Sequence, residues 1–141
     1  MLQYSYSMKT QFTIGVFGIV LDEQKRVLLC HRRDHDLWNL PGGGIENGES
    51  PWIGLKREVK EETGLEVDII NLVGVYSKSD KNEIVFSFFC KVIGGKITLN
   101  NEADKIEYFE FDKLPSNIFK NHIERIRDVI SSPGKTIYKS Q

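Results

Sequence analysis

The chain is poor in cysteine and in net charge, and each shortage excludes a class of protein. It carries only two cysteines, Cys30 and Cys90, too few for a four-thiolate zinc site. Each lies in an apolar run, which favours buried free thiols over a disulfide. A net charge of −1 argues against a surface that binds a nucleic-acid polymer, whereas a small anionic substrate needs only a few local cations.

Long apolar segments and linkers are also missing. No apolar run approaches the roughly 20 residues that cross a bilayer, and residues 1–10 lack the apolar core of a signal peptide. We therefore expect a cytoplasmic protein with no membrane partner. No repeat or flexible linker divides the 141 residues, which predicts a single domain over residues 1–141. We expect its ordered core over 10–131 and a frayed tail over 132–141.

Apolar patterns predict the strands of a mixed sheet. We expect strands over residues 12–21, 27–31, 67–76, 84–93 and 106–111. Gly94-Gly95 is expected to turn the chain into a hairpin strand over 96–99. The three glycines at 42–44 are expected to form a loop.

Two helices are predicted around this sheet. The first begins at Ser50-Pro51, a capping hydroxyl followed by proline at the first helical position, and ends at Thr63 before Gly64. The second is marked by apolar residues at helical spacing, namely Phe119, Ile123, Ile126 and Ile130. With one helix on each face of the sheet, the expected fold class is α/β, a three-layer α/β/α sandwich with a mixed central sheet.

The first helix gathers glutamates on one side. On a helical wheel, Trp52, Leu55 and Val59 form the expected core stripe. The arc beside that stripe holds Glu58, Glu61 and Glu62. Such a face is typical of an ordinary solvated surface, and that interpretation stays open here.

The placement of these charges also favours a metal site. Glu58 and Glu62 form a like-charged i,i+4 pair, which costs about 0.2–0.5 kcal/mol in an isolated helix. The negative end of the helix dipole adds to this cost, and Arg57 pairs most naturally with Glu61 alone. A hard divalent cation with oxygen ligands relieves the repulsion.

These residues resemble a known motif. Gly43, Glu49 and the run Arg57-Glu58-Val59-Lys60-Glu61-Glu62-Thr63-Gly64-Leu65 match the complete Nudix box without a substitution at its defining positions. Trp38 to Gly42 is similar to the family's approach to this box, and the element order extends the resemblance over residues 12–130. The resemblance implies the Nudix fold and an Mg²⁺-dependent pyrophosphohydrolase, with Mn²⁺ as an alternative metal. Its substrate would be a nucleoside diphosphate linked to another moiety, such as a nucleoside triphosphate or ADP-ribose.

The resemblance also implies roles for individual residues. Glu58 and Glu62 are the expected principal metal ligands, joined by Glu61 and by the carbonyl of Gly42. Arg57 and Glu49 are expected to orient these glutamates. The general base that takes a proton from the attacking water is either Glu61 or Glu102. Glu102 is alternatively a further metal ligand or an ordinary exposed acid of its loop.

Substrate contacts are expected outside the glutamates. Gly43 and Gly44 let the backbone approach a ligand closely. Arg33 is the expected phosphate contact, and strand alternation predicts that Arg32 and Arg33 point opposite ways. His122 is a candidate contact to the base or distal group, whereas His31 and His35 are interpreted as structural or surface residues.

An alternative to catalysis is a Nudix-fold sensor that binds a nucleotide without cleaving it. Loss of box glutamates would be the sign of such a sensor, and none is missing here. In either case the expected partner is a small nucleotide, and the chain is expected to act as a monomer or a homodimer.

Overall fold

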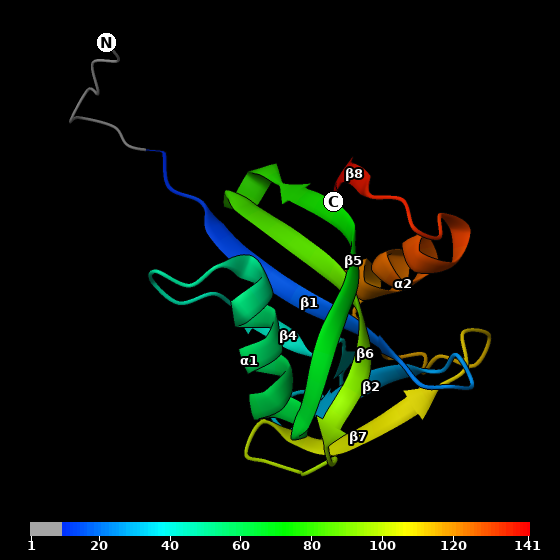
Figure 1. Ribbon diagram of the computed structural model, residues 1–141. Coiled ribbons are helices and arrows are strands. Elements are labelled where there is room, and N and C mark those ends of the chain that lie inside the picture. Colours follow the sequence, from blue (N-terminus) through cyan, green and yellow to red (C-terminus); the bar gives the residue numbers. More distant parts are fainter. Residues whose placement is uncertain (1–9) are drawn as a thin grey trace.

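The computed structural model describes residues 10–141 as one sheet flanked by two α-helices (Figure 1). The strands are β1 (Thr13–Leu21), β2 (Val27–Arg32), β3 (Trp38–Asn39), β4 (Gly42–Gly44), β5 (Leu65–Lys78), β6 (Glu83–Gly95), β7 (Ala103–Phe109) and β8 (Ile137–Ser140). The helices are α1 (Pro51–Thr63) and α2 (Lys120–Ser131), with a short 3₁₀ helix, η1, at Ser79–Lys81. No helix in residues 10–141 is long and apolar enough to cross a membrane.

The sheet is mixed, as predicted. Its strands follow the order β3-β2-β1-β6-β5-β8, with β4 paired to β1 and β7 paired to β2. The β1–β6 and β5–β8 pairs are parallel, and the other pairs are antiparallel. Because β1 lies between β2 and β6 and also pairs with β4, it anchors the glycine segment that precedes α1.

Two apolar clusters on opposite faces of the sheet confirm the three-layer sandwich. On the α1 face, Val16 and Val20 of β1 pack with Leu55 and Val59 of the helix. On the α2 face, Ile19 of β1 packs with residues that include Leu29, Trp38, Ile118 and Ile126. Successive strand residues point to opposite faces, so the doubly apolar pattern of β1 reflects burial from both sides. Figure 1 shows the two helices on either side of the sheet.

Three predicted segments differ from the structure because long-range pairing determines them. The glycines at 42–44 form β4 rather than a loop, since they pair with Gly15 to Phe17 of β1. Gly94 and Gly95 continue β6 against the start of β5, and residues 96–99 form no strand. The predicted strand over 106–111 begins earlier, at Ala103, where β7 pairs with the end of β2.

The predicted frayed tail over 132–141 is also wrong. Residues 137–140 add a parallel strand, β8, to the edge of β5 at Gly74 to Ser77. Lys139 Nζ lies 3.0 Å from carboxylate oxygens of both Glu124 and Asp128 on α2. These contacts with β5 and α2 order the tail, and no local sequence pattern encodes them.

Candidate active site

The ends of α1 are set by local signals, as predicted. The Ser50 hydroxyl accepts the Ile53 N–H at 3.4 Å, and Pro51 occupies the first turn. Gly64 ends the helix in the left-handed conformation (φ 81°) and donates its N–H to the Lys60 carbonyl. The buried face of the helix is formed by Gly54, Leu55, Val59 and Thr63. Trp52, predicted in the core stripe, is instead 56 % exposed.

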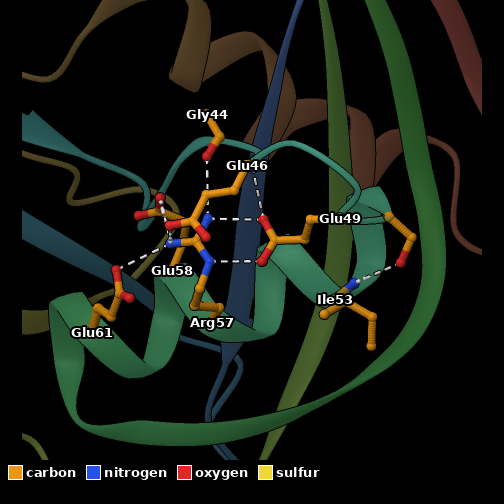
Figure 2. Close-up of polar contacts among 8 residues, drawn as sticks. Gly44, Glu46, Glu49, Ile53, Arg57, Glu58 and Glu61 are labelled. Atoms are coloured by element: carbon orange, nitrogen blue, oxygen red, sulfur yellow. Dashed lines mark hydrogen bonds and ion pairs between the residues drawn. The ribbon is translucent and has the colours of Figure 1, made fainter.

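Arg57 joins the glutamates of α1 to the preceding loop (Figure 2). Its guanidinium makes a bidentate contact with Glu49, with Nε and Nη2 lying 2.7 and 2.9 Å from the carboxylate oxygens. Its Nη1 donates to both Glu58 and Glu61 at 3.1 Å, and Nη2 donates to the Gly44 carbonyl at 3.3 Å. With Glu46, whose carboxylate oxygen lies 3.7 Å from Nη1, this one cation is shared among four carboxylates.

The Arg57–Glu49 pair is firmly charged. Hydrogen bonds from Arg57, and then from the Glu46 backbone N–H, lower the pKa of Glu49 to about 2. The same pairing raises the pKa of Arg57 above its already high ordinary value. Fork-shaped Arg–carboxylate contacts fix orientation as well as charge. Arg57 is therefore held in the position from which it contacts Glu58 and Glu61.

Glu58 lies against the glycine strand. A Cβ on residue 43 would lie 2.9 Å from the Glu58 carboxyl carbon, so any side chain here would displace this carboxylate from its position. Burial raises the pKa of Glu58, with Arg57 opposing the shift and Glu61 and Glu102 adding to it. Part of the energetic cost of ionising Glu58 thus remains uncompensated by the protein.

Glu62 is the more perturbed of the two carboxyls. It accepts the Gly42 N–H at 3.0 Å. Burial raises the pKa of Glu62, the charges of Glu58 and Glu102 add to this and the Gly42 N–H opposes it, and together they bring the pKa to about 8. Gly42 also must be glycine, because a Cβ there would lie 2.0 Å from the Val16 carbonyl oxygen. The amide N–H of Gly42 contacts Glu62 in the structure. The group of Gly42 predicted to bind the metal is its carbonyl.

This donor set fits a hard divalent cation. Glu58, Glu62 and Glu102 interact electrostatically, and Arg57 reaches only the first of them. Within residues 10–141, no three His, Cys, Asp or Glu side chains are already gathered into a metal-binding cluster. The oxygen atoms and excess negative charge that Mg²⁺ or Mn²⁺ requires are present. Because the carboxylates are not yet gathered, metal binding would require rotation of the glutamate side chains that now contact Arg57 and Gly42.

A cavity of about 700 Å³ opens beside these glutamates. Its wall is formed by Phe17, Cys30, His31, Arg32, Arg33, Asp34, Leu37, Asn39, Leu40, Gly42, Glu62, Asn101, Glu102, Ala103, Phe119 and His122. The wall therefore combines carboxylates, two arginines and aromatic rings. Of the predicted residues, Gly42, Glu62, Glu102, Arg33 and His122 line this cavity.

The two arginines share the cavity wall, contrary to the predicted alternation. The β2–β7 register shifts between His31 and Arg32, and β2 ends at Arg32, so strand alternation no longer applies. Arg32 is engaged by Asp34, with Nη2 2.6 Å from the carboxylate. Arg33 donates Nε to the Asn100 carbonyl at 2.8 Å and makes no ion pair within the described part of the chain. Arg33 thus keeps its charge available.

His122 lies at the aromatic part of the wall. It is only 3 % exposed and contacts the rings of Phe17 and Phe119 edge-on, with centroid distances of 4.8 and 5.4 Å. Burial, followed by the charges of Arg125 and Lys78, lowers the pKa of His122 well below its ordinary value. Its Nδ1 is buried without a hydrogen-bond partner in residues 10–141. The aromatic part of the wall therefore holds a neutral imidazole with one buried nitrogen that makes no hydrogen bond in residues 10–141.

His31 has a structural environment, as interpreted from the sequence. Its Nδ1 and Nε2 lie 2.6 Å from Asp104 and 2.7 Å from Asp36. These two carboxylates, Asp36 first, raise the pKa of His31. The contact joins β2, the following loop and β7 beside the cavity. Asp36 follows His31 by five residues, whereas Asp104 comes from a distant segment that no spacing rule connects with His31.

Comparison with known proteins agrees with this geometry. A family model described as the NUDIX domain matches residues 11–129. A putative 8-oxo-dGTP diphosphatase from Bacillus subtilis is 33 % identical over 118 residues, which cover 83 % of this chain and 79 % of that protein. An ADP-ribose pyrophosphatase from Methanocaldococcus jannaschii is 33 % identical over 130 residues, covering 87 % and 76 %.

The fold is found in solved structures as well. The crystal structure of a UDP-X diphosphatase superposes with a TM-score of 0.78 at 27 % identity, covering 94 % of this chain and 69 % of that one. A hydrolase from Nitrosomonas europaea gives a TM-score of 0.82 at 23 % identity, covering 95 % and 82 %. The second likeness concerns the fold alone.

Proposed function

Because this chain belongs to the Nudix family, whose members are hydrolases of acid anhydrides, we propose that it cleaves the phosphoanhydride bond of a nucleoside diphosphate linked to another moiety. The observation that supports this most is the carboxylate group at the cavity. Glu62 and Glu102 line a 700 Å³ space that also presents Arg32 and Arg33. Acids that repel one another and arginines on one wall suit a substrate made of phosphates together with a divalent cation.

The proposed metal ligands are Glu58, Glu61 and Glu62, with the Gly42 carbonyl. A divalent cation bound there would neutralise pyrophosphate charge and help position water for attack on phosphorus. Glu49 holds Arg57, and Arg57 in turn holds Glu58 and Glu61 in place. We assign this pair to orientation of the ligands rather than to contact with the substrate.

The remaining roles concern the proton and the substrate. Glu61 and Glu102 are both exposed carboxylates, and either suits the acceptor of the proton from water. Arg33 is proposed to contact the phosphates. Gly43 and Gly44 are proposed to bring backbone close to the substrate, and His122 to contact the base or distal group at the aromatic wall. The relatives named as acting on 8-oxo-dGTP and on ADP-ribose support a small nucleotide as the substrate.

A substrate panel with two variants tests the proposal. Turnover of 8-oxo-dGTP, ADP-ribose and a UDP-linked diphosphate is measured with Mg²⁺, with Mn²⁺ and with chelator. We expect Glu62→Gln to lower kcat by about 10³-fold, since a lost metal ligand removes several kcal/mol of transition-state stabilisation. Glu66→Gln is the matched control, because Glu66 is an exposed acid paired with Lys60.

The outcomes separate catalysis from sensing. Metal-dependent turnover that Glu62→Gln abolishes and Glu66→Gln preserves supports the proposal. Equal turnover by wild type and Glu62→Gln would rule out the assigned metal site. Tight nucleotide binding without turnover of any substrate would instead identify a nucleotide sensor.

A further inference from the structure

The C-terminal end of α1 is completed by a distant loop. The last carbonyls of a helix have no partner within it. Here Thr98 N–H donates to the Thr63 carbonyl at 2.9 Å, and the Asn100 side-chain Nδ2 donates to the Glu62 carbonyl. The loop between β6 and β7 is thereby attached to the same residue, Glu62, whose carboxylate faces the cavity.

The same Asn100 side chain shapes the segment that carries Glu102. Its Oδ1 accepts the N–H of Glu102 at 2.9 Å and that of Ala103 at 3.0 Å. This is the local turn for which asparagine is suited, and it leads directly into β7. One carboxamide therefore connects the backbone of Glu62 with the backbone of Glu102.

Arg33 completes the connection. Its Nε donates to the Asn100 carbonyl at 2.8 Å, and its backbone N–H donates to the Glu102 carbonyl at 2.9 Å. Three cavity-lining residues from separate parts of the sequence, Arg33, Glu62 and Glu102, thus meet through Asn100. Thr98 supports the same loop from its other side.

We propose that Asn100 is a positioning residue, whose carboxamide holds Glu102 in register with Glu62. Asparagine is suited to this role because it offers a donor and an acceptor at once, whereas aspartate lacks the donor and alanine lacks both. The proposal rests on the proposed hydrolase function. It requires that Glu102 contributes to turnover and that this contribution depends on Asn100.

Amide hydrogen exchange by NMR on the intact protein tests the placement without any substrate. Asn100→Ala removes the acceptor, so the Glu102 and Ala103 amides should exchange at least about 10-fold faster, the equivalent of about one lost hydrogen bond. Asn100→Asp keeps the acceptor and should leave them protected. Unchanged exchange in Asn100→Ala would overturn the placement.

A double-mutant cycle in kcat tests the role. Because a small misplacement of a catalytic group is costly, Asn100→Asp and Asn100→Ala should each lower kcat by about 10–100-fold, with KM changed less. Glu102→Gln should also lower kcat, and combining it with Asn100→Ala should cost little more than either alone. Asn71→Ala is the control, since within residues 10–141 the Asn71 side chain donates only to the neighbouring Leu72 carbonyl.

Each result of the cycle bears on one of the two proposals. Additive losses of kcat in the double mutant, or full activity of Glu102→Gln, would overturn the role of Asn100. The proposed hydrolase function would be unaffected by either result. Absence of turnover in the wild type refutes the proposed function, and with it the role of Asn100 in turnover. The thermal unfolding of each variant is measured separately. If Asn100→Ala does not fold, the kcat of Asn100→Asp decides whether Asn100 has this role.

Discussion

The two helices that cover the sheet are held in opposite ways. α1 has a side-chain N-cap, a proline start and a glycine end, and its charge is unbalanced, with Arg57 shared among several carboxylates. α2 begins at Lys120, its N-cap residue Phe119 gives no side-chain cap, and the helix buries Arg125 and Asp128. It is tied to the sheet by β8 and by Tyr76, whose hydroxyl donates to Asp128 at 2.8 Å.

Under the proposed function, this difference divides metal binding on α1 from substrate binding beside α2. The uncompensated acids of α1 suit a divalent cation. On α2, Arg125 is surrounded by the rings of Phe17 and Tyr76, and burial lowers the pKa of this arginine to about 10. Its neighbour His122 lines the cavity, and the buried Nδ1 of this histidine has no hydrogen-bond partner within residues 10–141.

The largest effect is expected from Glu62 in the metal-free protein. Because its folded-state pKa is raised to about 8, its contribution to stability is full below the ordinary pKa of glutamate and is lost as pH rises through 8. Chelator-treated wild type should lose on the order of 2–3 kcal/mol relative to Glu62→Gln between pH 5 and pH 9. Denaturant unfolding at several pH values measures this, and Mg²⁺ should remove the difference by replacing the proton.

Removing the Tyr76 hydroxyl should weaken the α2 side alone. Tyr76→Phe deletes the buried hydrogen bond to Asp128 and should cost about 1–3 kcal/mol of unfolding free energy. Turnover measured well below the melting temperature should stay within about twofold, since the α1 carboxylates are untouched. Tyr138→Phe, on an exposed side chain, is the control. A loss of turnover larger than the loss of folded protein explains would contradict the proposed division of roles between the helices.

His122 should affect binding more than folding. In His122→Leu the buried Nδ1 that lacks a partner is replaced by an apolar group, so the free protein should be as stable or slightly more stable. The KM of the nucleotide should rise about 10-fold with little change in kcat, because a binding contact is lost. His35→Leu, on an exposed histidine, is the control. An unchanged KM would remove His122 from the binding site.

The smallest expected effect concerns the helix ends. Ser50→Ala removes the N-cap of α1 and should cost about 1 kcal/mol in thermal unfolding. Ser131→Ala removes only a hydroxyl that donates back to the Arg127 carbonyl within α2 and should cost almost nothing. Equal costs at both positions would contradict the assignment of local capping to α1 alone.

The same contrast explains which features could be predicted from the sequence. The bounds of α1 and the shared face of Glu58 and Glu62 follow from caps and helical spacing, and the structure has both. Trp52 was placed in the core by the same spacing, yet it is exposed because packing over the sheet uses the neighbouring stripe. Periodicity gives the faces of a helix but not which of two adjacent arcs meets the sheet.

Features set by distant partners could not be predicted. β8 is ordered only because the edge of β5 and the acids of α2 accept it. At Asn100 the turn that accepts the N–H groups of Glu102 and Ala103 is local and typical of asparagine. The contacts with Glu62 and Arg33 reach distant segments, and no pattern near residue 100 reveals them.

Direct cation binding tests the central claim, that the acids of α1 hold a divalent metal. Mn²⁺ is titrated calorimetrically into chelator-treated wild type, Glu62→Gln and Glu66→Gln at pH 7 in two buffers of different ionisation enthalpy. We expect wild type and Glu66→Gln to bind Mn²⁺ alike with proton release, and Glu62→Gln to bind at least about 100-fold more weakly without that release. Equal affinity and equal proton release in wild type and Glu62→Gln would contradict the account.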